Sequence, residues 1–160
     1  MITSRREFLK TAGAAAAGAV VTPAVARAQP KKGVPKEPVK VGVIAIRAGI
    51  AAPVGMAGLR GTAWWADRVN KAGGILGRQV QLVVEEESNP KDTVERYRKL
   101  ILQDKVEVVV GGISTGVTLA LGPVAEDMET PWLAWDGTTQ KGVEETMPNP
   151  KWAFKSVDNE

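Results

Sequence analysis

The chain has 160 residues and contains neither cysteine nor histidine, which excludes disulfide bonds, thiol nucleophiles, histidine-based acid–base catalysis and the usual zinc and copper sites. We therefore expect no metal and no cofactor. The formal net charge is +3, but the first 28 residues carry four basic side chains against one acidic side chain, which accounts for the whole excess. The remainder is neutral, so charge gives no argument for binding nucleic acid.

The first 28 residues have the three parts of an export leader. Residues 4–10 (SRREFLK) resemble the twin-arginine motif, and a mild apolar run over residues 12–25 follows. That run is too short and too weakly apolar to span a bilayer, which takes about 20 predominantly apolar residues. A small-x-small pattern ends at Ala28, so we expect cleavage there and a mature periplasmic protein that begins at Gln29. Residues 29–38 are rich in proline and lysine, which predicts a flexible lead-in.

The mature chain opens with a strand and a helix. Val39–Ile46 is nearly all apolar, which is typical of a buried parallel strand. Small residues and Pro53 predict a loop over Arg47–Gly58. Apolar residues at helical spacing over 59–72 then predict a helix, which should end at Gly73–Gly74 because glycine favours the position after a helix.

A second strand–helix unit follows. Gln79–Glu86 alternates in part and predicts a strand near an edge of the sheet. The carboxylates of residues 85–87 are interpreted as a solvated strand end, because no further metal ligands accompany them. Residues 88–90 (SNP) predict a helix entry, and an apolar stripe over residues 94–101 predicts the buried face of the helix.

The third unit carries the first candidate site. The β-branched run Val106–Val110 stops at two glycines, and Ser114 or Thr115 then stands where the N-cap of a helix belongs. Free backbone N–H groups at such a junction, at the positive end of a helix dipole, suit an anion such as a carboxylate. The alternative is that Ser114 and Thr115 only cap their own helix. Pro123 lacks an N–H and falls inside this helix, so we expect a kink or an irregular turn around Leu119–Gly122.

The last part of the chain predicts two more strands. These are the short segments Pro131–Trp135 and Trp152–Val157, with an exit loop over Asp136–Gln140 between them. The alternation of strands and helices with short connections predicts an α/β fold, a doubly wound parallel sheet with helices on both faces. In such sheets ligands bind beyond the carboxyl ends of the strands.

Three predicted loops should meet at that edge of the sheet. They span Arg47–Gly55, Gly112–Gly116 and Asp136–Gln140, and they consist largely of glycine, serine, threonine and alanine. No loop offers a nucleophile with a neighbouring base, so the residues favour a binding site over a reaction centre and the chain is not expected to be an enzyme.

Three segments together resemble a known family. They are residues 73–78 (GGILGR) with the strand and acidic residues that follow, residues 114–120 (STGVTLA), and the Thr138–Thr139 pair. They resemble the periplasmic substrate-binding proteins of branched-chain amino acid ABC transporters. The resemblance covers residues 39–160, and implies one lobe of a two-lobed clamshell that holds an amino acid or related small carboxylate for a membrane permease. At this length the lobe is expected to be partial and the second lobe absent.

The resemblance also implies which residues contact the ligand. One wall would be the helix N-terminus at Ser114, Thr115 and Gly116, and a second wall would be formed by Gly137, Thr138 and Thr139. Trp135 could line the pocket or belong to the core.

Two other functions stay open at this stage. One is an exported Rossmann-type oxidoreductase, but Gly49, Gly55 and Gly58 do not form the G-x-G-x-x-G pattern. The other is a sensor module of the same fold that presents its ligand to a receptor.

Overall fold

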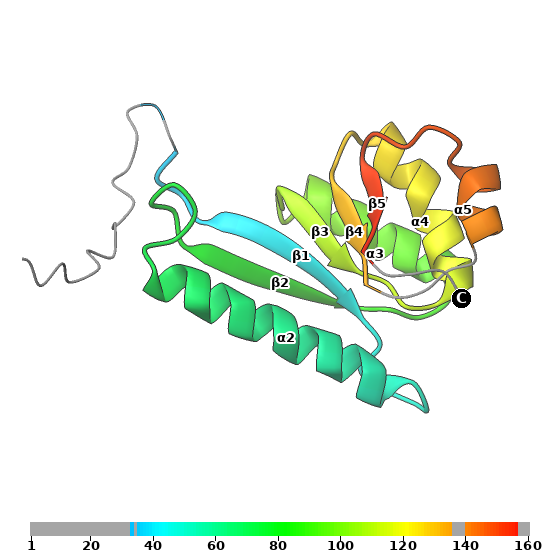
Figure 1. Ribbon diagram of the computed structural model, residues 1–160, viewed down its shortest axis with the longest axis horizontal. Helices are drawn as coiled ribbons and strands as arrows, with labels where there is room; N and C mark the ends of the chain where they lie inside the picture. Colours follow the sequence, from blue (N-terminus) through cyan, green and yellow to red (C-terminus); the bar gives the residue numbers. More distant parts are fainter. Residues whose placement is uncertain (1–32, 34, 136–139, 157–160) are drawn as a thin grey trace, which may run out of the picture.

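The computed structural model describes residues 33, 35–135 and 140–156, and within these ranges it is a single parallel sheet flanked by helices (Figure 1). The strand order is β2-β1-β3-β4-β5 and every pairing is parallel. The α/β prediction is therefore confirmed. The elements are β1 (Val39–Ala45), α2 (Ala52–Lys71), β2 (Val80–Glu86), α3 (Pro90–Leu102), β3 (Val108–Gly111), α4 (Thr115–Asp127), β4 (Trp132–Ala134), α5 (Gln140–Thr146) and β5 (Ala153–Lys155).

The two faces of the sheet carry different helices, as predicted. Val39 and Val41 of β1 cluster with Ala66 of α2, and α2 runs along β1 and β2 (Figure 1). Ile44, on the opposite face of the same strand, belongs to the larger core formed with α3 and α4. On the α2 side, Leu133 of β4 and Phe154 of β5 remain 37% and 51% exposed.

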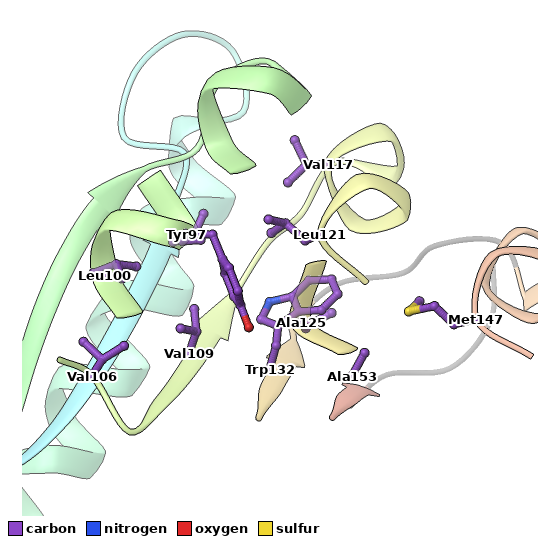
Figure 2. Packing of buried hydrophobic residues seen from close by; sticks show 12 residues of the cluster. Tyr97, Leu100, Val106, Val109, Val117, Leu121, Ala125, Trp132, Met147 and Ala153 are labelled. Carbon is purple, nitrogen blue, oxygen red and sulfur yellow. The ribbon is translucent and has the colours of Figure 1, made fainter. Parts of the chain in front are cut away.

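The larger core is built around two aromatic side chains that also satisfy backbone groups. Tyr97 of α3 and Trp132 of β4 lie close together in Figure 2, and both are almost fully buried. The Tyr97 hydroxyl donates to the carbonyl of Thr130 (3.1 Å), and the Trp132 indole N–H donates to the carbonyl of Gly111 (2.9 Å). Trp132 therefore holds the residue at which β3 ends.

Helix α2 begins at Ala52, so the predicted loop through Gly58 is wrong in its second half. Pro53 is tolerated in the first turn of a helix. Gly55 and Gly58 lie within this helix, at positions where other groups come too close for a side chain, and not in a turn. A Cβ atom would lie 2.0 Å from the Ile46 carbonyl oxygen at Gly55, and 2.6 Å from the Trp135 ring at Gly58. The end of the helix was predicted correctly, and Gly73 follows it with φ 105°.

Two differences concern the second half of the chain. Helix α5 was not predicted; it is fixed by Val143 and Met147, which pack against the larger core. Met147 lies so close to Gly122 of α4 that a Cβ atom there would come within 1.9 Å of its sulfur. The irregular turn considered around Leu119–Gly122 is absent, because α4 is one continuous helix that includes Pro123.

No helix in the described part of the chain combines the length and the apolar character needed to cross a membrane.

Candidate ligand-binding site

The topological switch point of the sheet lies at the carboxyl ends of β1 and β3. These strands are neighbours, and the helices that follow them, α2 and α4, lie on opposite faces. Ligands of doubly wound sheets bind in the crevice at such a point. Here a cavity of about 270 Å³ is lined by Val54, Ala57 and Gly58 of α2, by Ile113 of the β3–α4 loop and by Trp135 after β4.

The β3–α4 loop takes its shape from two glycines. Gly111 and Gly112 have φ angles of 108° and 98°, which residues with a side chain rarely adopt. Space is also restricted, because a Cβ atom at Gly111 would lie 2.0 Å from the carbonyl oxygen of Ile44. The N–H of Gly112 donates to that same oxygen (3.1 Å). The chain therefore leaves the sheet at the end of β3, and the N–H groups of the next residues lie beyond the strand pairing.

Two of these N–H groups are bound by a carboxylate of the chain itself. The oxygens of Glu87 accept hydrogen bonds from the N–H groups of Ile113 and Ser114, both at 2.8 Å, and Glu87 is only 3% exposed. The sequence reading of residues 85–87 as a solvated strand end is therefore wrong for Glu87. The expectation that the junction offers free N–H groups is wrong for Ile113 and Ser114. The physical reason is that a buried carboxylate needs strong donors, and a helix N-terminus supplies them.

The other two carboxylates of this run are also engaged. Glu86 accepts from the N–H and the Nε of Arg47, at 2.7 and 2.8 Å, and so holds the β1–α2 loop. Burial raises the pKa of Glu86, but the hydrogen bonds from Arg47 outweigh burial and the net pKa lies below its ordinary value. Glu85 pairs with Lys99 of α3 at 2.6 Å. Through Glu86 and Glu87, the end of β2 thus binds the segments that follow β1 and β3, the two strands that flank the crevice.

The three residues predicted at the helix N-terminus lie there. Ser114 is the N-cap by position, with extended backbone (φ −73°, ψ 130°), but its side chain makes no capping hydrogen bond. The alternative that the Ser114 side chain caps its own helix is therefore wrong. The first bond of the helix runs from the N–H of Thr118 to the carbonyl of Ser114 (2.9 Å). The N–H groups of Thr115 and Gly116 precede that bond, so they have no acceptor within the helix.

Trp135 stands between two cavities. Its ring lies against Gly58 of α2 and lines the crevice cavity on one side. On the other side it lines a larger apolar cavity of about 510 Å³, together with residues such as Val110 of β3 and Leu133 of β4. Gly137, Thr138 and Thr139 lie outside the described residues, as does most of the predicted exit loop.

The glycines considered for the cofactor loop of a Rossmann-type oxidoreductase do not form such a loop. Gly55 and Gly58 lie inside α2 and not in a phosphate-binding turn after β1. Within the described ranges, no three carboxylates gather in a way that could hold a metal ion. The sequence signal that was missed is the acidic run at the end of β2, whose last member, Glu87, is a buried partner of the β3–α4 loop.

Comparisons with known proteins agree with this architecture. A family model described as periplasmic binding protein matches residues 38–154, and one for the twin-arginine translocation signal sequence matches residues 3–22. The Leu/Ile/Val-binding protein BraC3 of Rhizobium johnstonii is 30% identical over 110 residues, which cover 66% of this chain and 30% of that protein.

Solved structures show the same fold. The branched-chain amino acid transporter substrate-binding protein LivJ of Streptococcus pneumoniae, in complex with isoleucine, is 27% identical with a TM-score of 0.67. The match covers 76% of this chain and 34% of that one. A solute-binding protein of an ABC transporter from R. palustris, in complex with 4-hydroxybenzoate, is 24% identical with a TM-score of 0.62, covering 73% of this chain and 31% of that one.

The chain thus spans about a third of the length of these relatives. Its leader is a twin-arginine signal that directs export to the periplasm. On the match over residues 38–154, the chain belongs to the periplasmic binding protein family.

Proposed function

We propose that this chain supplies one wall of a ligand-binding cleft in a solute-binding protein, which delivers a small carboxylate to an ABC permease. One observation supports this proposal above the others. The cavity lined by Ile113 and Trp135 lies at the crevice between β1 and β3, and the residues directly after Ile113 begin helix α4. An apolar cavity next to the positive end of a helix suits a molecule with one carboxylate and one apolar part.

The lining of the cavity favours an aliphatic or aromatic side chain on that ligand. Val54, Ala57 and Ile113 are aliphatic, and Trp135 adds a ring. The streptococcal relative was solved with isoleucine and the R. palustris one with 4-hydroxybenzoate. Both molecules join a carboxylate to an apolar body, so both are suitable probes. Gly137, Thr138 and Thr139 remain proposed members of the opposite wall.

The test is an NMR titration of the mature chain from Gln29, since chemical shifts detect even the weak binding expected from one wall of a cleft. L-isoleucine should shift the amides of Thr115 and Gly116, and isoleucinol, which lacks the carboxylate, should not. Ser114→Ala should weaken binding severalfold. The matched control is Ser88→Ala, which removes a hydroxyl that accepts a hydrogen bond from Arg96 of α3.

Two results would contradict the proposal. Equal shifts with isoleucine and isoleucinol would show that no carboxylate is recognised at α4. Failure of both L-isoleucine and 4-hydroxybenzoate to shift any amide of the crevice, in a folded chain, would remove this ligand class.

A further inference from the structure

Glu87 shares the β3–α4 loop with the proposed ligand. We propose that Glu87 is a positioning residue of this site, and that the ligand carboxylate binds beside it on the N–H groups of Thr115 and Gly116. This inference rests on the proposed function. In the simpler view of this junction, the ligand would bind the N–H groups of Ile113 and Ser114. Glu87 already accepts hydrogen bonds from both of them.

The backbone around Glu87 is held on both sides. Its own N–H donates to the carbonyl of Ala45, the last residue of β1 (3.0 Å), and the N–H of Ser88 donates to the hydroxyl of Thr93 (3.0 Å). Thr93 is fully buried in α3. The carboxylate therefore extends from a fixed point, and its position is set by β1 and α3 and not by the loop that it contacts.

The Glu87 side chain reaches across the end of one strand to the next. In the sheet, β1 lies between β2 and β3, so a residue that follows β2 must pass over the carboxyl end of β1 to reach the β3–α4 loop. Glu87 thus holds the loop that carries Ile113, one of the residues that line the crevice cavity.

The two hydrogen bonds determine where the cavity wall stands. Ile113 donates its N–H to Glu87 while the residue itself lines the cavity next to Trp135. If the carboxylate were removed, two donors would lose their partner and the loop, whose glycines allow many conformations, could turn away. Both the wall at Ile113 and the donors at the start of α4 would then move.

Charge explains why the ligand does not displace Glu87. A ligand that displaced Glu87 would separate a carboxylate that is only 3% exposed from its two N–H donors. Loss of those partners is unfavourable for a buried charge. A second carboxylate in the same place would also be repelled by the first at close range. The N–H groups of Thr115 and Gly116, which have no acceptor within the helix, are therefore the donors proposed for the ligand.

The experiment measures amide exchange and ligand binding in Glu87→Ala and Glu87→Gln. We expect the Ile113 and Ser114 amides to exchange at least about tenfold faster in Glu87→Ala, because each loses a charge-assisted bond. Core amides of β1, such as Ile44, should keep their rates; a merely structural role would accelerate both groups together. The matched control is Glu107→Gln, which removes a carboxylate that pairs with Arg78 away from the crevice.

Chemical rescue distinguishes an anion site from simple packing. Sodium acetate should restore slow exchange to Ile113 and Ser114 in Glu87→Ala with a saturable dependence on concentration, whereas sodium chloride at the same ionic strength should not. Affinity for L-isoleucine should fall about tenfold in Glu87→Ala and recover in part with acetate. Glu87→Gln keeps one acceptor, so it should lie between wild type and Glu87→Ala; it also serves if the alanine variant does not fold.

The outcomes separate the two proposals. Unchanged exchange of Ile113 and Ser114 in both variants would overturn the positioning role. Faster exchange with unchanged isoleucine affinity would reduce Glu87 to a helix cap and overturn its role in binding. A wild-type chain that binds neither isoleucine nor 4-hydroxybenzoate would overturn the proposed function, while the exchange data would still decide whether Glu87 holds the loop.

Discussion

The contact between Gly58 and Trp135 predicts opposite effects for two alanine substitutions in the same helix. Gly58 and Gly61 both lie within α2, so changing either to alanine should stabilise the helix by about 0.5–1 kcal/mol. At Gly61 a Cβ atom meets nothing within 4 Å. At Gly58 it would lie 2.6 Å from two atoms of the Trp135 ring.

The size of the effect follows from that distance. Carbon atoms pack at about 3.5–4.0 Å, so the ring or the helix must shift by roughly 1 Å to admit the methyl group. Overpacking of this kind costs about 1–3 kcal/mol. Because both variants share the same gain in helix propensity, the difference between their free energies of unfolding should equal the cost of overpacking. We expect Gly58→Ala to be less stable than Gly61→Ala by about 1–3 kcal/mol.

The assay is urea unfolding of the mature chain, followed by far-UV circular dichroism. A double-mutant cycle with Trp135→Ala tests the cause, because the penalty of Gly58→Ala should disappear when the ring is gone. If Gly58→Ala stabilises the protein as much as Gly61→Ala does, Trp135 does not lie on α2 and the crevice cavity is not bounded as described.

Two further predictions concern pH. Burial, and then the charge of Glu126, raise the pKa of Tyr97 above its ordinary value of 10.0; its contribution to stability is therefore present below about pH 10 and lost as pH rises further. At pH 7, Tyr97→Phe should be less stable than wild type by about 1 kcal/mol, because it loses the hydrogen bond to Thr130. Above pH 10 the difference in melting temperature between the two proteins should become smaller, and a difference that stays constant with pH would contradict this. Glu126 accepts from the N–H groups of residues that include Trp152 and Ala153, and although burial raises its pKa, these bonds bring the net pKa below 4.5. Its stabilisation should be present above about pH 4.5 and lost as pH falls, so Glu126→Gln should weaken amide protection at Ala153 at pH 7, and equal protection in the variant would refute the role.

Much of the fold follows directly from the sequence. The apolar runs of β1 and β3 identify buried parallel strands, because only such strands are apolar on both faces. Asn89–Pro90 identifies the start of α3; the Asn89 side chain accepts from the N–H of Asp92 at 2.9 Å. The direction of the pairings among β1, β2, β3 and β4 then follows from the helical connections, whereas the helix between β4 and β5 was not predicted.

The features that were missed depend on contacts between distant segments. Gly55 and Gly58 indicate a loop locally, but each is required where another part of the chain presses against α2. Glu87 is one of three adjacent carboxylates with nothing local to distinguish it, and only the position of the β3–α4 loop makes it a buried acceptor. The proposed site residues Ser114, Thr115 and Gly116 could be placed at the start of α4 because they follow a strand end. The donors already used by Glu87 could not be foreseen.

The central place of β1 has a consequence for the timing of folding. Val41 pairs with Leu82 on one side and with Val108 on the other, so the first strand behind the leader waits for segments synthesised much later. Pairings that are distant in sequence fold slowly. A twin-arginine signal serves proteins that cross the membrane already folded. Export in a folded state therefore requires that β3 has been made and has paired with β1.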